Sequence, residues 1–187
     1  MERPKWGDYF MILAKIAASR STCNSRPVGC VLVKDKQVLS TGYNGAVSQA
    51  KHCSQIGGEG YCVRRDKEAT VDAKQNVCLA SHAEITALAL AAKKGISVDG
   101  STLYITLNPC MVCLKTLKIA GVSSIIYELE YDFNTVKDFD KMVQNMGFNY
   151  CFKMKLSQET IDMVKTFLDS PTSYRRLKAE KMDGRNS

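Results

Sequence analysis

Residues 102–129 read TLYITLNPCMVCLKTLKIAGVSSIIYEL and decide the fold class. The pattern predicts an apolar strand over 102–107, a helix over 110–120 that ends at Gly121, and a second strand over 122–128. Near-continuously apolar strands joined by a helix are typical of parallel strands that are covered on both faces.

The rest of the chain continues this alternation. Helices are predicted over residues 8–18, 82–94, 136–146 and 158–168, and strands over 28–33, 37–43 and 148–154. The first two of these strands are joined by Lys34-Asp35-Lys36, which indicates a hairpin. Residues 46–79 lack a clear period and predict a long insertion that carries function or a metal. We therefore expect an α/β protein with a mostly parallel sheet.

The length and charge limit the architecture. A chain of 187 residues favours one domain, expected over residues 1–171, followed by a basic tail over 172–187. The tail holds five Lys/Arg and two acidic residues, a net +3 of the formal +7. The remaining body is only mildly basic, which favours affinity for small phosphates over a polynucleotide groove.

The composition points to a cytoplasmic protein. Apolar residues make up 45% and charged residues 24%, and no apolar run approaches the roughly 18 residues that a membrane span needs. No signal peptide is visible at the N-terminus, so we expect no export. Eight cysteines in such a chain favour metal binding over disulfides.

Three metal ligands are predicted at the starts of two helices. His82 opens one helix, and Cys110 and Cys113 open the next after Pro109. Cysteines at positions i and i+3 lie on one helical face, and proline is tolerated in a first helical turn. The helix dipoles would lower the pKa of the two thiols. Three protein ligands leave one tetrahedral position of a zinc ion for water, which is typical of a catalytic site.

Glu84 and Ala83 complete this predicted site. Zinc lowers the pKa of its water toward about 7. Glu84 would then take the proton of that water, deliver it to a ring nitrogen and later protonate departing ammonia. The backbone N–H of Ala83 would hold a carbonyl oxygen of the base.

Each assignment has a structural alternative. Residues 81–84 also fit a capping box, in which Glu84 would only close a helix end. Cys110 and Cys113 fit a structural zinc knuckle, and His82 fits a satisfied core histidine.

The sequence resembles the deoxycytidylate (dCMP) deaminases of the zinc-dependent cytidine deaminase superfamily. His82-Ala83-Glu84 with Pro109-Cys110-x-x-Cys113 matches the superfamily signature. The resemblance extends over residues 5–155 through these further segments: 6–10, 21–23, 26–29, 40–45, 52–53, 126–127 and 131–132. It implies a three-layer α/β/α sandwich with a mixed, mostly parallel five-stranded sheet.

The resemblance also implies function and partners. It implies hydrolysis of dCMP to dUMP, with 5-modified dCMP as a further substrate left open, in a homo-oligomer that is commonly a hexamer. It further implies activation by dCTP with Mg²⁺ and inhibition by dTTP. No membrane partner is expected, and polynucleotide substrates are the less favoured alternative.

Further residues are assigned by the same resemblance. Asn44 would contact the sugar and base, and Arg26 is the candidate for the 5′-phosphate, because a guanidinium binds phosphate oxygens bidentately. Tyr127 and Tyr131 would complete the phosphate pocket, with core packing as the alternative for both. The run Gly42, Tyr43, Asn44 and Gly45 is associated with nucleotide effectors.

The resemblance further implies a second, structural zinc. Family members hold such an ion through residues corresponding to Cys23 and Cys53. Cys62 and Cys78 are the candidates for the remaining ligands, with His52 as the substitute for either. Cys30 and Cys151 lie in apolar strand patterns and are expected to be core residues.

Two rival functions stay open. Thr86 stands where the family often has Asn, and residues 84–88 look almost as much like tRNA adenosine deaminases, so a deaminase of tRNA or single-stranded DNA is the first alternative. A zinc-stapled interaction module without catalysis is the second.

Overall fold

The structure is a computed structural model that describes residues 3–65, 78–131 and 139–169. Contacts divide the chain into two compact units, one of residues 10–154 and one of residues 1–9 with 155–187. The single domain over 1–171 stays a prediction, and the basic tail over 172–187 lies outside the described residues.

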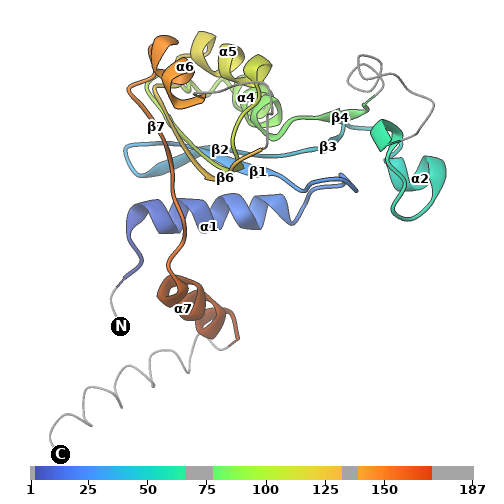
Figure 1. The fold of residues 1–187 in the computed structure, drawn as a ribbon, viewed down its shortest axis with the longest axis horizontal. Coiled ribbons are helices and arrows are strands. Elements are labelled where there is room, and N and C mark those ends of the chain that lie inside the picture. Colours follow the sequence, from blue (N-terminus) through green and yellow to red (C-terminus); the bar gives the residue numbers. More distant parts are fainter. Residues whose placement is uncertain (1–2, 66–77, 132–138, 170–187) are drawn as a thin grey trace, which may run out of the picture. The chain divides into compact units, whose positions relative to one another are not determined.

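A five-stranded sheet forms the centre of the larger unit (Figure 1). Its strands are β1 (Gly29–Lys34), β2 (Gln37–Tyr43), β5 (Thr102–Leu107), β6 (Ser124–Leu129) and β7 (Tyr150–Lys153), in the order β2-β1-β5-β6-β7. β1 is antiparallel to both β2 and β5, whereas β5, β6 and β7 are parallel. The predicted mixed five-stranded α/β sheet is confirmed, with the parallel arrangement confined to these last three strands.

The β1–β2 hairpin closes in a tight turn. Asp35 and Lys36 both have positive φ, 51° and 61°. Two successive residues with positive φ match the twist of antiparallel strands, so the predicted turn forms where its sequence placed it.

Helices cover both faces of the sheet (Figure 1). Residues 10–18 of α1 (Trp6–Ala18) lie on one face, and α4 (Ala83–Lys93), α5 (Met111–Ile119) and α6 (Phe139–Asn145) lie on the other. Along β5, Tyr104 contacts Phe10 of α1, while Leu103 and Ile105 enter the core under α4 and α5. Strands buried on both faces explain the continuous apolar runs in the sequence.

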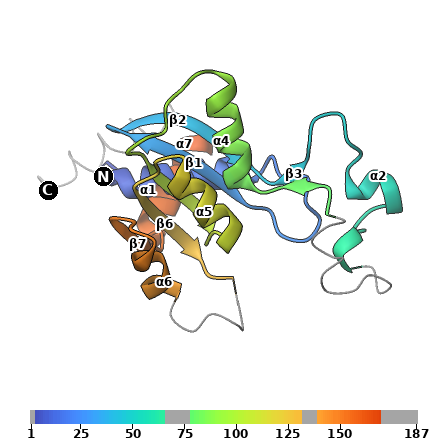
Figure 2. The same cartoon turned by 90° about the horizontal axis from the view of Figure 1, so that it is seen from above.

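Two glycines bring helices close to the sheet. A Cβ atom on Gly29 would lie 2.3 Å from the carbonyl oxygen of Ala14 in α1. A Cβ atom on Gly42 would lie 2.1 Å from the carbonyl oxygen of Ala83 in α4. Seen from above, α4 runs over β1 and β2 (Figure 2).

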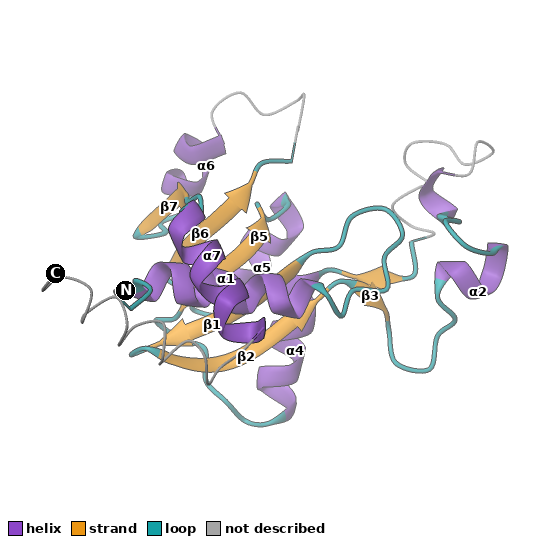
Figure 3. Cartoon of the chain, turned by 90° about the horizontal axis from the view of Figure 1, so that it is seen from below, coloured by secondary structure: helices purple, strands orange, loops and turns teal. Residues whose placement is uncertain are grey.

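The predicted insertion extends from the edge of the core (Figure 3). β3 (Gly45–Ala46) pairs with β4 (Ala80–Ser81) where the insertion begins and ends. Its described part contains the short helix α2 (Cys53–Gly57) and a 3₁₀ turn over Val63–Arg65. Asn24 forms two hydrogen bonds with this segment. Its side-chain nitrogen donates to the backbone carbonyl of Tyr61 at 2.9 Å, and its backbone carbonyl accepts from the side chain of Arg65 at 2.7 Å. Residues 66–77 lie outside the description.

The smaller unit contains α7 (Gln158–Asp169). The hydroxyl of Ser157 accepts the backbone N–H of Thr160 at 3.1 Å, which satisfies a free N–H of the first turn. The hydroxyl of Thr160 donates to Asp8 at 3.1 Å. None of the described helices has the length and hydropathy of a membrane span.

Candidate active site

Two predicted metal ligands occupy equivalent positions in two helices. His82 is the N-cap of α4 and Cys110 is the N-cap of α5, both with extended backbone angles. Cys113 lies one turn further into α5 and is buried. The first turns of both helices, with N–H groups that lack intrahelical partners, therefore border one site.

The three donor atoms fit a zinc ion. The Nδ1 atom of His82 lies 3.6 Å from Sγ of Cys110 and 3.4 Å from Sγ of Cys113, and all three atoms are within 4.8 Å of one another. Tetrahedral zinc with ordinary Zn–N and Zn–S lengths places nitrogen and sulfur ligands about 3.6 Å apart. His82, Cys110 and Cys113 are thus assembled as the sequence predicted, in the spacing and chemistry of a three-ligand zinc site.

The pKa values of the three donor groups reflect their mutual contacts. Hydrogen bonding from the Cys113 thiol and from His82 outweighs burial and lowers the pKa of Cys110 to about 4. The Cys110 neighbour and burial both raise the pKa of Cys113. Hydrogen bonding to Cys110 raises the pKa of His82. These opposite shifts show that the three donor groups act directly on one another.

Glu84 lies in the first turn of α4, and its side chain contacts Cys113. Its side chain is 4% exposed, and burial raises the pKa of its carboxyl group. A carboxyl group with a raised pKa exchanges protons closer to neutral pH, as proton transfer to a substrate requires. Ala83, 1% exposed, brings its backbone N–H to the start of the same helix.

The capping-box alternative for Glu84 does not match the observed geometry. α4 begins after His82, so Ser81 is outside the helix and Glu84 stands at its second position, where it cannot close a capping box. Pro109 likewise lies before the N-cap Cys110 and outside the first turn in which it was predicted. The α5 helix starts one residue later than expected because Cys110 adopts an extended conformation.

Asn44 organises the loop that carries Arg26. Its side-chain oxygen accepts from the Ser21 hydroxyl at 2.6 Å and from the Val28 N–H at 2.8 Å. Its side-chain nitrogen donates to the carbonyl of Arg26 at 2.8 Å. Asn44 therefore holds the 26–28 loop, and the predicted contact of its amide with a sugar or base stays a prediction.

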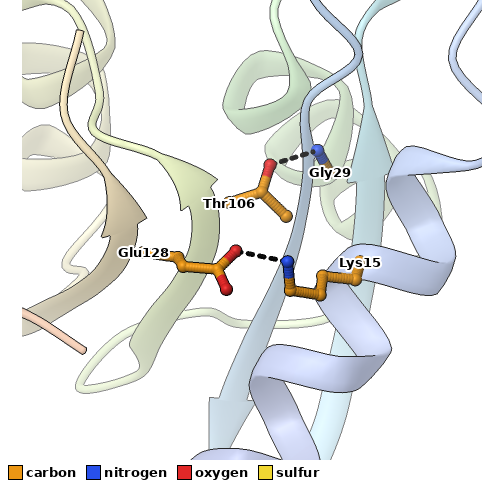
Figure 4. A network of polar contacts seen from close by, with 4 residues as sticks. All are labelled: Lys15, Gly29, Thr106 and Glu128. Carbon is orange, nitrogen blue, oxygen red and sulfur yellow. Dashed lines mark hydrogen bonds and ion pairs between the residues drawn. The ribbon is translucent and has the colours of Figure 1, made fainter. Parts of the chain in front are cut away.

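This loop lies at the edge of the sheet from which Cys110 emerges, because β1 starts where its antiparallel neighbour β5 ends. The hydroxyl of Thr106 accepts the N–H of Gly29 at 3.1 Å across these strands (Figure 4). Beside this bond, Lys15 of α1 forms an ion pair of 2.6 Å with Glu128 of β6 (Figure 4). The start of β1 is thus fixed against its neighbours.

Arg26 reaches one of the two predicted tyrosines. Its guanidinium carbon lies 4.3 Å from the centroid of the Tyr131 ring. Tyr127, in contrast, is 2% exposed and its ring packs edge-on against Phe139. The burial of Tyr127 fits the packing alternative, and its role in a phosphate pocket stays a prediction.

The predicted effector run contributes to packing. Gly42 allows α4 to approach the sheet closely because it has no side chain. A Cβ atom on Gly45 would lie 2.4 Å from the hydroxyl oxygen of Thr22. Tyr43 and Asn44 are half-buried. Binding of an effector to this run stays a prediction.

The four candidate cysteines of the second metal site line one cavity. The cavity is open to solvent and also borders His82 and Asn44. The lining cysteines are Cys23, Cys53, Cys62 and Cys78. Among the described residues, however, only the His82 group has three donor atoms within 4.8 Å of one another. His52, the predicted substitute, is the N-cap of α2 next to Cys53.

Two residues of the site were not predicted from the sequence. Arg64 lines the cavity together with His82, and Asn108 accepts the N–H of Tyr131 with its side chain at 2.6 Å. An arginine in a charged insertion carries no distinctive signal. The position of Asn108 directly before Pro109 and Cys110 was the available indication.

Fold and donor set together define a zinc-binding α/β protein. Residues 4–129 match the family model described as the cytidine and deoxycytidylate deaminase zinc-binding region. The chain belongs to this family.

Curated relatives and a solved structure agree with this assignment. The chain is 35% identical over 133 residues to the deoxycytidylate deaminase of Schizosaccharomyces pombe, which covers 71% of this chain and 40% of that protein. It is 37% identical over 135 residues to the deoxycytidylate deaminase of Mycobacterium phage D29, which covers 70% and 99%. The crystal structure of the dCMP deaminase of cyanophage S-TIM5 with dCMP and dUMP has a TM-score of 0.61 and 30% identity, covering 82% of this chain and all of that one.

The relatives differ in length. This chain spans 40% of the S. pombe protein and 44% of the deoxycytidylate deaminase of Saccharomyces cerevisiae, to which it is 36% identical over 145 residues.

Proposed function

We propose that this protein is a zinc-dependent hydrolase that converts dCMP and water to dUMP and ammonia. The observation that carries the proposal is the burial of Glu84 next to a His82, Cys110 and Cys113 donor set at two helix N-termini. The names of the deoxycytidylate deaminases to which the chain is similar, and the dCMP and dUMP bound in the phage structure, support the choice of substrate.

The residues of the chain divide the chemistry between them. His82, Cys110 and Cys113 would hold the zinc ion, which when bound supplies Lewis acidity that activates water. Glu84 accepts the first proton of the attacking water and passes it to the ring nitrogen beside the amino-bearing carbon. It then takes the remaining proton from the hydroxyl group that has been added to this carbon and gives it to the amino group, which leaves as ammonia. The N–H of Ala83, at the first position of α4, has no acceptor within the helix and would donate to the carbonyl oxygen of the base.

Arg26 is the proposed ligand of the 5′-phosphate. It is exposed at the edge of the sheet that carries the metal ligands, its carbonyl is held by Asn44, and its guanidinium is stacked on Tyr131. Such a guanidinium donates two parallel hydrogen bonds to phosphate oxygens. Arg26→Ala should therefore raise KM for dCMP far more than KM for deoxycytidine. Equal effects on both substrates would refute the assignment.

One assay tests the activity and its alternatives. Ammonia release is measured with dCMP, 5-methyl-dCMP, deoxycytidine, dCTP and tRNA as separate substrates. The proposal expects the highest kcat/KM with dCMP. Release from tRNA alone, with a steep dependence on salt, would instead support a polynucleotide deaminase. Release from none of them would support the interaction module.

A second, structural zinc in the cysteine-lined cavity is also proposed. The four thiols line one cavity. The surroundings of Cys62 also favour the thiolate form that binds zinc. Although burial opposes ionisation, hydrogen bonds from Arg64 and Arg65 lower the pKa of Cys62. A metal would draw the separated sulfur atoms together and stabilise an insertion with few core residues. Two zinc ions per chain are expected, and Cys53→Ser should reduce the count to one while Cys151→Ser leaves it at two.

Regulation and assembly complete the proposal. Activation by dCTP with Mg²⁺ and inhibition by dTTP are expected from the family resemblance, with Gly42, Tyr43, Asn44 and Gly45 as the candidate contacts. Measuring kcat/KM for dCMP with each nucleotide tests this regulation. A value of kcat/KM that neither nucleotide changes would contradict the proposed regulation. Sedimentation equilibrium tests the expected hexamer, and a monomeric protein would contradict it.

A further inference from the structure

We propose that Asn108 is a positioning residue that fixes the Arg26–Tyr131 pair, so that the residue two places before the metal ligand Cys110 controls recognition of the substrate phosphate. This inference rests on the proposed function. The inference goes beyond the proposed function because it assigns phosphate selectivity to a residue that does not contact the phosphate itself.

Asn108 joins the end of β5 to the chain that follows β6. Its backbone N–H donates to the carbonyl of Leu129 at 2.9 Å, and its side-chain oxygen accepts the N–H of Tyr131 at 2.6 Å. The residue is 6% exposed. Both bonds leave Asn108 in the same direction, toward the segment that holds Tyr131.

The side-chain bond replaces a main-chain bond that the backbone cannot make. The parallel pairing of β5 with β6 ends at Leu107 and Leu129. Beyond this pair the chain turns through Pro109 into α5, so the main chain of β5 no longer runs beside Tyr131. The amide oxygen of Asn108 supplies the acceptor that continued pairing would have supplied.

Tyr131 transmits this restraint to Arg26. Its ring stacks on the guanidinium at 4.3 Å, while Asn44 holds the backbone carbonyl of Arg26 at 2.8 Å. Arg26 is therefore fixed at its backbone from the side of β2 and at its guanidinium from the side of β6. An arginine that is oriented before binding loses less rotamer freedom when a phosphate arrives.

The chemistry of position 108 sets the design of the test. Asn108→Leu keeps the size of the side chain and removes the acceptor, whereas Asn108→Asp keeps an acceptor oxygen. Asn149→Leu is the matched control, because Asn149 is exposed in the turn before β7. Tyr131→Leu removes the ring but keeps the N–H, and it tests the same coupling if Asn108→Leu does not fold.

The measured quantities are KM and kcat for dCMP and deoxycytidine, together with zinc content. Asn108→Leu and Tyr131→Leu are each expected to raise KM for dCMP about tenfold, with a change of about twofold or less in KM for deoxycytidine and in kcat, and with unchanged zinc. Asn108→Asp is expected to retain most of the preference for dCMP. The double variant Arg26→Ala/Asn108→Leu should be no worse than Arg26→Ala alone, because both changes remove the same interaction.

Several results would overturn the inference. Equal increases in KM for both substrates, additive effects in the double variant, or loss of zinc in a folded Asn108→Leu protein would show that Asn108 acts elsewhere. Calorimetric binding of dUMP and deoxyuridine separates this failure from that of the proposed function. A wild-type protein that neither deaminates dCMP nor prefers dUMP over deoxyuridine overturns both, whereas a preference that is lost only in Arg26→Ala overturns the role of Asn108 alone.

Discussion

The imidazole of His82 and the thiol of Cys113 meet at 3.4 Å although they come from different helices. His82 ends the connection from β4, and Cys113 lies one turn inside α5. Their meeting point therefore depends on how α4 and α5 are placed on the sheet. The helix positions set the geometry of the metal site, and Gly42 lies where α4 approaches the sheet closely.

Gly42 tests the placement of α4. Gly42→Ala would put a Cβ atom 2.1 Å from the carbonyl oxygen of Ala83, so α4 must shift. We expect a loss of about 1–3 kcal/mol in the free energy of unfolding, together with a large loss of activity. Chemical denaturation and the dCMP assay measure the two effects. Thr41→Ala, at the exposed neighbouring position, is the control and should change neither. A fully active Gly42→Ala protein would contradict the proposed placement.

Thr106 tests the connection between β1 and β5. Thr106→Val keeps the shape of the side chain but leaves the N–H of Gly29 without its acceptor in a buried position. A loss of about 1–3 kcal/mol in the free energy of unfolding is expected. Thr106→Ser, which keeps the hydroxyl, should lose clearly less. If the Thr106→Val and Thr106→Ser proteins have the same free energy of unfolding, this hydrogen bond does not contribute to stability.

The burial of Glu84 predicts a stability that depends on pH. Its raised pKa means that the folded protein disfavours the charged carboxylate. At a pH below the ordinary value for glutamate, the group is protonated in both the folded and unfolded states, and no cost arises. As the pH rises through the raised folded value, the buried charge progressively destabilises the protein.

Glu84→Gln removes this charge. Metal-free Glu84→Gln protein should therefore have a higher Tm than metal-free wild type at pH 8, and the difference should vanish near pH 4. Thermal unfolding of both proteins in the presence of a chelator measures this difference. An advantage that is constant over this pH range would show that ionisation of Glu84 is not its cause.

The sequence predicts the regular elements well because their signals are local. Periodic apolar residues located β5, α5 and β6, and the positive φ of Asp35 and Lys36 follows from a turn that the sequence already indicated. The start of α5 was placed one residue early, since a cysteine N-cap has no strong propensity signal. The ligand set His82, Cys110 and Cys113 was predicted because its spacing is restrictive.

Contacts between distant side chains were not predictable in the same way. The amide of Asn44 binds Ser21, Arg26 and Val28, which depends on the register of β1 and β2. The bond from Tyr131 to Asn108 depends on where the β5–β6 pairing ends. Such partners are set by tertiary structure, so a single sequence shows the residues but not what they bind.

The central claim is that Glu84 transfers protons next to a bound zinc ion. The most direct measurement combines the zinc content and the dCMP deamination rate of Glu84→Gln. The account predicts one catalytic zinc per site, as in wild type, with kcat reduced about a hundredfold or more. Deamination at the wild-type rate by the zinc-loaded variant would contradict it.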